Sequence, residues 1–422
     1  MRRVIWVIFA VVFSARAAAG QTAAPPAPAE TIKALLERIE KLETRLGELE
    51  GKLSSPPAAC STPSDAGVSF HANMHGGGPS VEPAQEPKTA VEQAAAQEQA
   101  TYPSLQIRGF TDVNFSATDQ RGSTSGFNLG QFALHIASPL SKKVSYFGEI
   151  SFTAQPTGFA LEVERSVIRY DYNDYFKISF GRYHAPINYW NTAFHHGLWL
   201  QTTISRPEMI QFGGRFLPVH FVGLLAEGSL PSGGLGLGYN VGLGNGRGSI
   251  ISRAGDAGDV NNHRAWVLSL FSRPAALRGL QVGGAVYRDK LSAASRPEVR
   301  ELITSAHIVW TREKPEFLAE FSNVHHRDIF TGRVFNSQAY YFQVAYRLPW
   351  QENHWKPYYR FEYIHTPGSE PVLGVPNLVG STVGVRYDIS EYAAFKTEYR
   401  NTRRQAGEPR VNGVFIQTSF TF

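Results

Sequence analysis

The sequence predicts an all-β protein: a 16-stranded antiparallel transmembrane β-barrel, preceded by a short α-helical coiled coil and a disordered linker. The first observation behind this prediction is the last strand, 412–422, where side chains alternate in character up to a terminal aromatic residue, Phe422. The second is the repetition of similar segments of about ten residues from residue 105 onward. The third is the composition, because 39 Gly, 27 Phe and 18 Tyr with only 18% charged residues favour strands.

The last strand has one face that suits lipid and one that suits water. Val414, Ile416 and Phe420 share a face with Phe422, while Gln417 belongs to the opposite face. A final amphipathic strand with a C-terminal Phe resembles the recognition signal of bacterial outer-membrane barrels, in which the last strand pairs with the first and leaves no edge. The predicted membrane-insertion signal is therefore Phe420 and Phe422. The alternative is an ordinary edge strand that ends the chain.

Residues 1–20 form a predicted secretory signal peptide. Two arginines precede an apolar run, 4–13, and small residues follow it, which is typical of a leader cleaved near Gln21. The apolar run is short for a membrane-spanning helix. Cys60 is the only cysteine, which excludes an intrachain disulfide. The net charge of +5 is mild, and the sequence lacks the basic stripe expected of a nucleic-acid-binding protein.

Residues 31–53 form a predicted coiled coil, because apolar residues recur there at alternating spacings of three and four. Arginines at g and glutamates at e allow salt bridges between parallel helices. Two Arg-apolar-x-x-apolar-Glu segments resemble the pattern associated with three strands, whereas Ile at a with Leu at d favours two. The remaining alternative is a solitary amphipathic helix, which Gly47 and Gly51 would weaken. The predicted trimerisation residues are Ile32, Leu35, Arg38, Ile39, Leu42, Glu43, Arg45, Leu46, Leu49 and Glu50.

Residues 54–102 are rich in Pro, Ala, Gln and Gly and nearly free of aromatic residues, so we expect a disordered linker. The barrel domain follows, over 103–422. Its sixteen predicted strands are 105–117, 127–138, 144–153, 160–172, 175–184, 219–230, 235–244, 263–273, 279–289, 300–312, 315–325, 335–348, 355–365, 378–388, 393–402 and 411–422. An even number allows every strand of an antiparallel sheet to pair when the sheet closes.

The connections between the strands are expected to alternate between short periplasmic turns and longer outer loops. The longest connection, 185–218, is the third of the outer loops. Its length and position resemble the third loop of general porins, which folds into the lumen and narrows it. A strand over 209–216 is an alternative that would change the strand count.

Charged residues occupy alternate positions in several strands, opposite an apolar face. A charged side chain that faces lipid near the midplane costs about 2–4 kcal/mol, so the charged face is predicted to line a water-filled lumen. A solvated face of a soluble sheet is the alternative. Arginines in a constriction attract anions, although the loop residues could also pack the loop against the wall. The predicted pore-lining residues are Arg182, His184, His195, His196, Arg206, Arg215, Lys356, Arg360, Arg386, Lys396 and Arg400.

No catalytic or metal-binding motif is found in the sequence. The histidine pairs 195–196 and 325–326 lack further ligands at suitable spacing, and neither a nucleophile elbow nor a P-loop occurs. We therefore expect no cofactor, no metal and no catalytic residues.

The signal peptide, heptads, linker, sixteen strands and terminal Phe together resemble trimeric bacterial outer-membrane porins, in particular coiled-coil-bearing relatives of the phosphate-selective porin O and P family. The resemblance covers the mature chain nearly end to end in architecture. In that family, pore arginines and a ring of lysines select phosphate, but lysines are sparse in this barrel, among them Lys177, Lys290, Lys356 and Lys396.

The resemblance implies a channel for small hydrophilic solutes with a mild anion preference, constricted by loop 185–218. It implies a location in the bacterial outer membrane, with the coiled coil and linker in the periplasm. The implied partners are further copies of the chain, outer-membrane lipid and lipopolysaccharide, the barrel-assembly machinery, and small hydrophilic or anionic solutes. The alternatives are a structural tether to the cell wall anchored by the barrel, and an enzyme built on a barrel.

Overall fold

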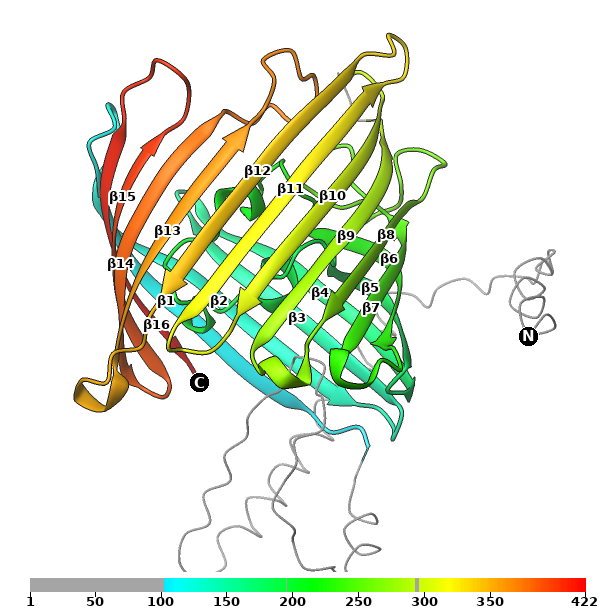
Figure 1. The fold of residues 1–422 in the computed structure, drawn as a ribbon, viewed down its shortest axis with the longest axis horizontal. Coiled ribbons are helices and arrows are strands. Elements are labelled where there is room, and N and C mark those ends of the chain that lie inside the picture. The colour runs from blue at the N-terminus through cyan, green and yellow to red at the C-terminus, as the bar shows by residue number, and fades with distance from the viewer. Residues whose placement is uncertain (1–101, 195, 293–295) are drawn as a thin grey trace, which may run out of the picture. The chain divides into compact units, whose positions relative to one another are not determined.

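The computed structural model describes residues 102–194, 196–292 and 296–422. These residues form sixteen strands in one closed barrel, where each strand pairs with its chain neighbours and β1 pairs with β16 (Figure 1). The predicted all-β, 16-stranded antiparallel barrel is therefore confirmed. The predicted signal peptide and coiled coil, and the linker up to residue 101, lie outside the described residues.

The strands begin and end close to the predicted segments. They are β1 (Gln106–Thr118), β2 (Gly126–Pro139), β3 (Val144–Gln155), β4 (Gly158–Asn173), β5 (Phe176–His184), β6 (His220–Ser229), β7 (Leu237–Asn245), β8 (Ala265–Ser272), β9 (Leu280–Leu291), β10 (Val299–Trp310), β11 (Glu316–Asp328), β12 (Val334–Ala345), β13 (Trp355–His365), β14 (Leu378–Ser390), β15 (Ala393–Arg403) and β16 (Val411–Thr421).

The helices lie in the connections and are short: α4 (Trp190–Ala193), η1 (Leu198–Leu200), η2 (Glu208–Ile210), η3 (Gly233–Leu235), η4 (Ala275–Leu277) and η5 (Gln351–Asn353). Among the described residues, no helix has both the length and the apolar character that crossing a membrane requires.

The two faces of the barrel wall differ in polarity, because successive side chains of a strand point to opposite faces. In β12 the exposed positions include Tyr340, Phe342 and Val344, while Ser337 and Gln343 are buried. The outward face is thus largely apolar, and the inward face carries many polar and charged side chains. The buried charged residues of the strands include Asp112, Glu149, Glu164, Asp289, Glu301, Glu320, Lys356, Arg360, Arg386, Lys396 and Glu398.

The barrel closes through the C-terminal residue, as the last strand predicted. The N–H of Gly109 donates to the Phe422 carbonyl at 2.8 Å, and the N–H of Phe422 donates to the Gly109 carbonyl at 3.0 Å. The Phe422 ring lies directly over Gly109, where a Cβ would come within 2.3 Å of it. Only glycine leaves room for the ring at this position, so β1 and β16 are matched at the seam.

The connections separate into two rims. The turn rim lies beside the start of β1 and the end of β16, and the loop rim lies at the other ends of the strands. The expected alternation of lengths is incomplete, because only Pro156 and Thr157 join β3 to β4 at the loop rim. These two strands are 12 and 16 residues long and together form an extended hairpin, so a tight turn suffices. The long connection 185–218 is the third at the loop rim, as predicted.

The alternative strand at 209–216 does not form. The backbone there hydrogen-bonds locally, with the Ile210 N–H on the Pro207 carbonyl and the Gly214 N–H on the Gln211 carbonyl, both at 2.9 Å. Pro207 just before the segment and the Gly213–Gly214 pair within it favour turns over ladder pairing. The count of sixteen strands is therefore unaffected.

Candidate functional site

Residues 185–218, apart from residue 195, form what we call the inner loop, which connects β5 to β6. Its backbone and side chains contact the inward face of the barrel, and its short helices lie within the ring of strands in Figure 1. Gly197 has a φ of +84° and lies so close to Phe110 of β1 that a Cβ would come within 2.8 Å of the ring. The inner loop therefore reaches across to the seam of the barrel.

The first half of the inner loop packs against β11 and β12. The Trp190 indole is 1% exposed and meets the Tyr341 ring edge-on at 6.0 Å. The main-chain N–H of Trp190 donates to Glu320 Oε1 at 2.6 Å, and Asn188 Nδ2 donates to Ser322 Oγ at 2.8 Å. Aromatic packing and two hydrogen bonds thus hold the inner loop against the wall at α4 and just before it.

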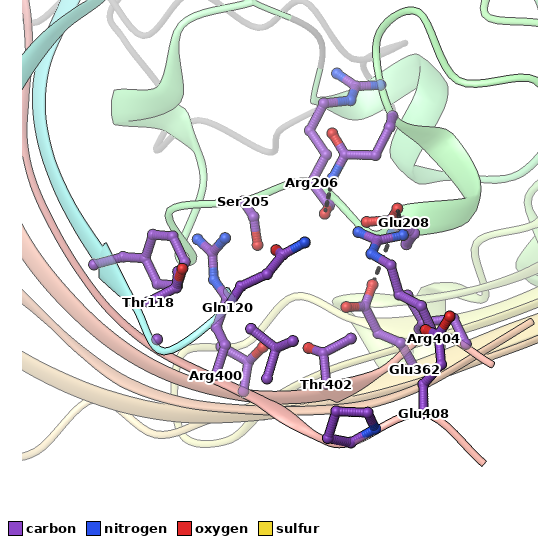
Figure 2. A pocket seen from close by; sticks show the side chains of 17 residues that line it. Thr118, Gln120, Ser205, Arg206, Glu208, Glu362, Arg400, Thr402, Arg404 and Glu408 are labelled. Atoms are coloured by element: carbon purple, nitrogen blue, oxygen red, sulfur yellow. Dashed lines mark hydrogen bonds and ion pairs between the residues drawn. The ribbon is translucent and has the colours of Figure 1, made fainter. Parts of the chain in front are cut away.

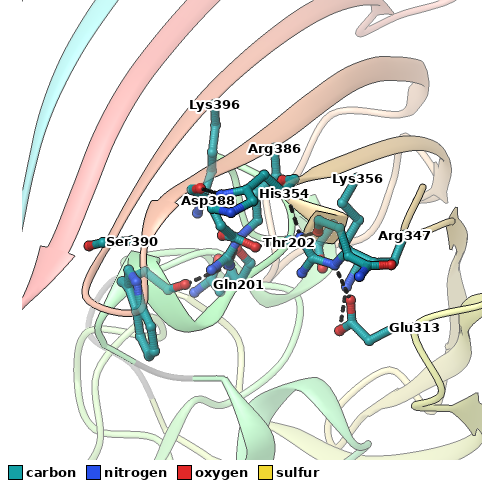
Figure 3. A network of polar contacts seen from close by, with 12 residues as sticks. Gln201, Thr202, Glu313, Arg347, His354, Lys356, Arg386, Asp388, Ser390 and Lys396 are labelled. Atoms are coloured by element: carbon teal, nitrogen blue, oxygen red, sulfur yellow. Dashed lines mark hydrogen bonds and ion pairs between the residues drawn. The ribbon is translucent and has the colours of Figure 1, made fainter. Parts of the chain in front are cut away.

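The cations of β13, β14 and β15 bind main-chain carbonyls of the inner loop. Arg360 donates to the Ser205 carbonyl at 2.8 Å, and Arg386 donates to the Gln201 carbonyl at 2.9 Å. Lys396 donates to the Thr203 carbonyl at 3.2 Å (Figure 3 shows Arg386 and Lys396). Because these carbonyls belong to an irregular segment without ladder partners, the wall supplies the hydrogen bonds that the backbone requires.

Carboxylates of the same wall bind main-chain N–H groups of the inner loop. Glu398 Oε1 accepts from the Ile204 N–H at 2.6 Å, and Glu362 Oε1 accepts from the Glu208 N–H at 2.7 Å. Alternating cations and carboxylates therefore match the alternating carbonyl and N–H groups of an extended chain. We call the inward face of β13–β15 the backbone-binding wall.

A turn-rim network supports this wall (Figure 3). Lys356 Nζ lies 2.9 Å from Glu313 Oε1 and 2.7 Å from Glu316 Oε2, and Glu313 also binds Arg347. Burial by itself raises the pKa of Glu313, but the two cations outweigh this and lower it. Glu316 in turn accepts a hydrogen bond from the Thr202 hydroxyl at 2.9 Å, which links the turn rim to the inner loop.

The opposite wall, on β2–β6, holds the inner loop through imidazoles. Glu164 lies 3.1 Å from Nε2 of His196 in the loop and 2.9 Å from Nε2 of His220 in β6. Glu149 lies 2.9 Å from Nε2 of His135, and His184 approaches it at 3.7 Å. We call the inward face of β2–β6 the histidine wall.

Arg206 lies at the centre of the inner loop and binds the loop to itself. Its guanidinium donates to the Ile210 carbonyl at 2.8 Å and to the Phe194 carbonyl at 3.1 Å, and it lies 4.0 Å above the Phe212 ring. Burial lowers the pKa of Arg206 to about 9. This value is still above neutral pH, so the guanidinium keeps its charge there. This residue organises the loop rather than facing open solvent.

A second buried network ties the loop-rim connections to β10 and β11. His326 places Nε2 2.8 Å from Glu301 and Nδ1 2.7 Å from Glu370, which belongs to the connection 366–377. Arg247 of the connection after β7 lies 3.0 Å from Glu301 and donates to the Phe216 carbonyl of the inner loop at 2.8 Å. Three loop-rim connections are therefore joined through one charged chain.

A cavity of about 210 Å³ lies between the inner loop, β13–β16 and the connection after β15 (Figure 2). Arg404 Nη1 lies 2.8 Å from Glu208 Oε1, and Arg400 lies 2.5 Å from Glu398 and 3.7 Å over the Phe415 ring. The other lining residues are Thr118, Gln120, Ser205, Arg206, Gln211, Glu362, Leu378, Thr382, Thr402, Glu408, Pro409, Val411 and Gly413. Charges of both signs thus face this space.

The predicted pore-lining residues lie in several parts of the barrel, and Arg206 is the one at the centre of the inner loop. Lys356, Arg360, Arg386 and Lys396 are buried in the backbone-binding wall or its support, and His184 and His196 belong to the histidine wall. Arg182 donates to the His220 ring at 3.0 Å and lies 3.3 Å from Asp256. Arg400 lines the cavity and Arg215 is exposed at the loop rim, whereas His195 lies outside the described residues.

The predicted pore-lining residues include no carboxylate. Four glutamates at inward positions of their strands nevertheless bind the inner loop: Glu164, Glu320, Glu362 and Glu398. The signal that could have identified them is the same alternation that identified the cations, because the glutamates share the inward face. Within the described residues, no group of three or more His, Cys, Asp or Glu side chains is arranged to hold a metal ion.

No family model and no curated protein matches the sequence. Solved structures do match the fold. The anion-selective porin from Comamonas acidovorans has a TM-score of 0.57 at 10% identity, over 76% of this chain and 100% of that one. The outer-membrane channel DcaP of Acinetobacter baumannii has 0.52 at 12%, over 76% and 97%. The trimer form of OmpT from Vibrio cholerae has 0.51 at 13%, over 76% and 99%. The described residues therefore have the fold of bacterial outer-membrane porins.

Proposed function

We propose that this protein is a channel in the bacterial outer membrane that lets small hydrophilic solutes diffuse passively, with the inner loop as its constriction. The observation that supports this most strongly is the inner loop itself, whose carbonyl and N–H groups bind the charged inward faces of β13–β15. The inner loop, held across the barrel in this way, narrows the lumen, and the cavity of about 210 Å³ remains between it and β13–β16. Neither the tether nor the enzyme is favoured by the described residues.

The finer part of the proposal is a mild anion preference. Most of the buried cations are engaged with the inner loop or with carboxylates, so the arginines that can act on passing ions are those near the cavity and the loop rim, Arg400, Arg404 and Arg215. Glu208 and Glu362 lie beside the first two and offset much of their charge. Selectivity is therefore expected to be modest.

We further propose that the chain is exported by its signal peptide, inserted by the barrel-assembly machinery through its C-terminal strand, and assembled as a homotrimer by the coiled coil in the periplasm. The trimer form of OmpT, named above, lends support from a shared fold. Deletion of 31–102 is expected to leave a conducting barrel with weaker trimers. Loss of conduction would contradict the proposal that the coiled coil assembles the trimer while the barrel alone conducts.

Conductance of the purified protein in planar lipid bilayers tests the proposal. Stepwise current increases are expected, and the reversal potential under a salt gradient should indicate a weak preference for anions. Absence of conductance would contradict the channel, and a clear preference for cations would contradict the anion preference alone.

A further inference from the structure

The connection between β13 and β14, residues 366–377, packs against other parts of the loop rim, and we call it the strap. Its residues Val372 and Leu373 are fully buried. Leu373 belongs to the apolar cluster that contains Phe216 of the inner loop, while Val372 belongs to a second cluster with Ile251 of the connection after β7. The strap therefore shares its packing with the inner loop and with a second outer connection.

One carboxylate organises the strap. Glu370 Oε2 accepts from the main-chain N–H groups of Val372 at 3.1 Å and of Leu373 at 2.6 Å. Its Oε1 lies 2.7 Å from Nδ1 of His326 in β11. Burial by itself raises the pKa of Glu370, but the hydrogen bonds from His326 and from these N–H groups outweigh this and lower it. The Glu370 carboxylate is therefore ionised at neutral pH.

Both ring nitrogens of His326 face carboxylates. While Nδ1 binds Glu370 of the strap, Nε2 lies 2.8 Å from Glu301 Oε2 of β10, and the side chains of His326 and Glu301 are both buried. An ionised carboxylate only accepts hydrogen bonds, so each ring nitrogen needs a proton to bind its partner. The observed arrangement is thus that of an imidazolium. A neutral imidazole has one N–H and would leave one of the two carboxylates without its donor.

The elements around this ring carry further charges. Arg247 of the connection after β7 pairs with Glu301, and two main-chain carbonyls also accept from its guanidinium. On β12 the residue opposite His326 is Phe335, which does not titrate. The other charged groups are Asp289 of β9, which is opposite Glu301, Asp328 of β11, and Arg215 and Arg296, which lie next to Gly374 of the strap. Carboxylates on β9, β10 and β11 thus gather here, and the proton of His326 lies between Glu301 and Glu370.

We propose that the strap is a pH-sensitive lid, tied to the barrel wall while His326 carries both ring protons and released when the ring loses one. The tie is present at low pH and is lost as the pH rises through the range in which histidine titrates. Because Leu373 packs in the same cluster as the inner loop, release loosens the cover of the constriction at the loop rim. The effect on conduction rests on the proposed function, whereas the release of the strap does not.

Hydrogen exchange of the strap in the detergent-purified full chain tests the proposal, with each rate divided by that of an unstructured peptide at the same pH. Between about pH 5.5 and about pH 9, protection of the parent strap should fall about ten- to a hundredfold, as expected for the loss of a hydrogen bond to a charged group. H326Q presents a donor to one carboxylate and an acceptor to the other, so its protection should be low at both pH values. The matched control is H325Q, because His325 is the next residue but bonds to Asn336 at the exposed surface, and this variant should behave as the parent does.

The variant E370Q separates the proton from the packing of the strap. Its amide can donate to the unprotonated Nδ1 of a neutral His326 while Nε2–H still binds Glu301, so the tie no longer needs a second ring proton. Protection of the strap in E370Q should therefore not fall as the pH rises. A parent strap whose protection is independent of pH, the same fall in E370Q or H326Q as in the parent, or a loss of protection in H325Q equal to that in H326Q would each overturn the proposal.

Conductance over the same pH series separates this inference from the proposed function. The conductance of the parent should rise over the interval in which the strap loses protection, and H326Q should have the higher conductance already at low pH. A conducting protein whose conductance does not follow the release of the strap would overturn the lid and leave the channel intact. A parent that releases the strap but never conducts would instead contradict the channel.

Discussion

The two walls that hold the inner loop use different chemistry. The backbone-binding wall on β13–β15 places arginine, lysine and glutamate against main-chain groups of the loop. The histidine wall on β2–β6 places Glu164 against a loop side chain, His196. Every residue type has the same main-chain groups, so these contacts of the backbone-binding wall fix the path of the loop. The contact with Glu164, in contrast, requires a histidine at position 196.

This difference has a consequence for the loop sequence. Between residues 201 and 205, the hydroxyl of Thr202 donates to Glu316, and the hydroxyls of Thr203 and Ser205 accept from Arg360. Only a position that the wall binds through its main chain alone is therefore free to vary in type. Gln201 illustrates this, since its side chain is fully buried and has no hydrogen-bond partner among the described residues, while its carbonyl binds Arg386. His196, in contrast, is bound through its ring.

The largest expected effect comes from Arg360→Leu in the backbone-binding wall. Arg360 is 1% exposed, and its loss leaves the Ser205 carbonyl and the Glu362 carboxylate without their cation. Removing one partner of a buried pair costs about 3–5 kcal/mol. Denaturant unfolding in detergent should show this loss, and the single-channel conductance should rise because the loop is released from one wall.

Arg253→Leu is the matched control. Arg253 also pairs with a glutamate, Glu162 at 2.8 Å, but its side chain is 61% exposed. An exposed pair contributes about 0–1 kcal/mol, so neither the stability nor the conductance should change appreciably. Equal effects of the two substitutions would mean that burial against the loop does not distinguish the two arginines.

Glu164→Gln is expected to have a smaller effect, on the histidine wall. The amide keeps the shape of the side chain but replaces one acceptor oxygen between His196 and His220 with a donor, at a cost of about 1–3 kcal/mol. A double-mutant cycle with His196→Gln should reveal coupling between the two positions. Glu162→Gln on the same strand serves as control. Additive effects of the coupled pair would contradict direct recognition of the His196 ring.

The barrel could be predicted from the sequence because its signals are local. Alternation of side chains in β12 and β13, and the terminal Phe422, depend only on neighbouring positions. The incomplete alternation of connection lengths was not predictable in this way. It depends on how far the β3–β4 hairpin extends, which is a property of strand pairing across the barrel.

The candidate site could be predicted only in part. The alternation identified inward cations such as Arg360 and Lys396, but it could not tell that both bind the inner loop, because their partners lie more than 150 residues away in the chain. The carboxylates Glu362 and Glu398 carried the same inward signal. They bind loop N–H groups, and no sequence pattern marks an N–H as a partner.

The stability of the protein should depend on pH through Glu313, because its carboxylate pairs with Lys356 and Arg347 beneath the backbone-binding wall. Lys356 and Arg347 lower the pKa of Glu313 despite its partial burial, so its folded-state pKa lies below its unfolded value. Its stabilising contribution is therefore complete above the unfolded pKa, about 4.3, and is lost as the pH falls through the folded pKa. Glu313→Gln should be less stable than the parent at pH 7 and should approach it in strong acid. A stability difference that does not change with pH would contradict the ion-pair explanation.

The smallest expected effect comes from Arg400→Gln, at the cavity beside the backbone-binding wall. Arg400 lies 2.5 Å from the buried Glu398, so most of its field is already compensated, and its side chain is 22% exposed. The remaining interaction of Arg400 with a passing ion in water is expected to be about 1 kcal/mol or less, which corresponds to less than about a fivefold change in the anion-to-cation permeability ratio. The change should favour cations, since Glu398 loses its partner, and the reversal potential under a salt gradient measures it. A larger shift, or one toward anions, would mean that Arg400 does not act on ions through its pairing with Glu398.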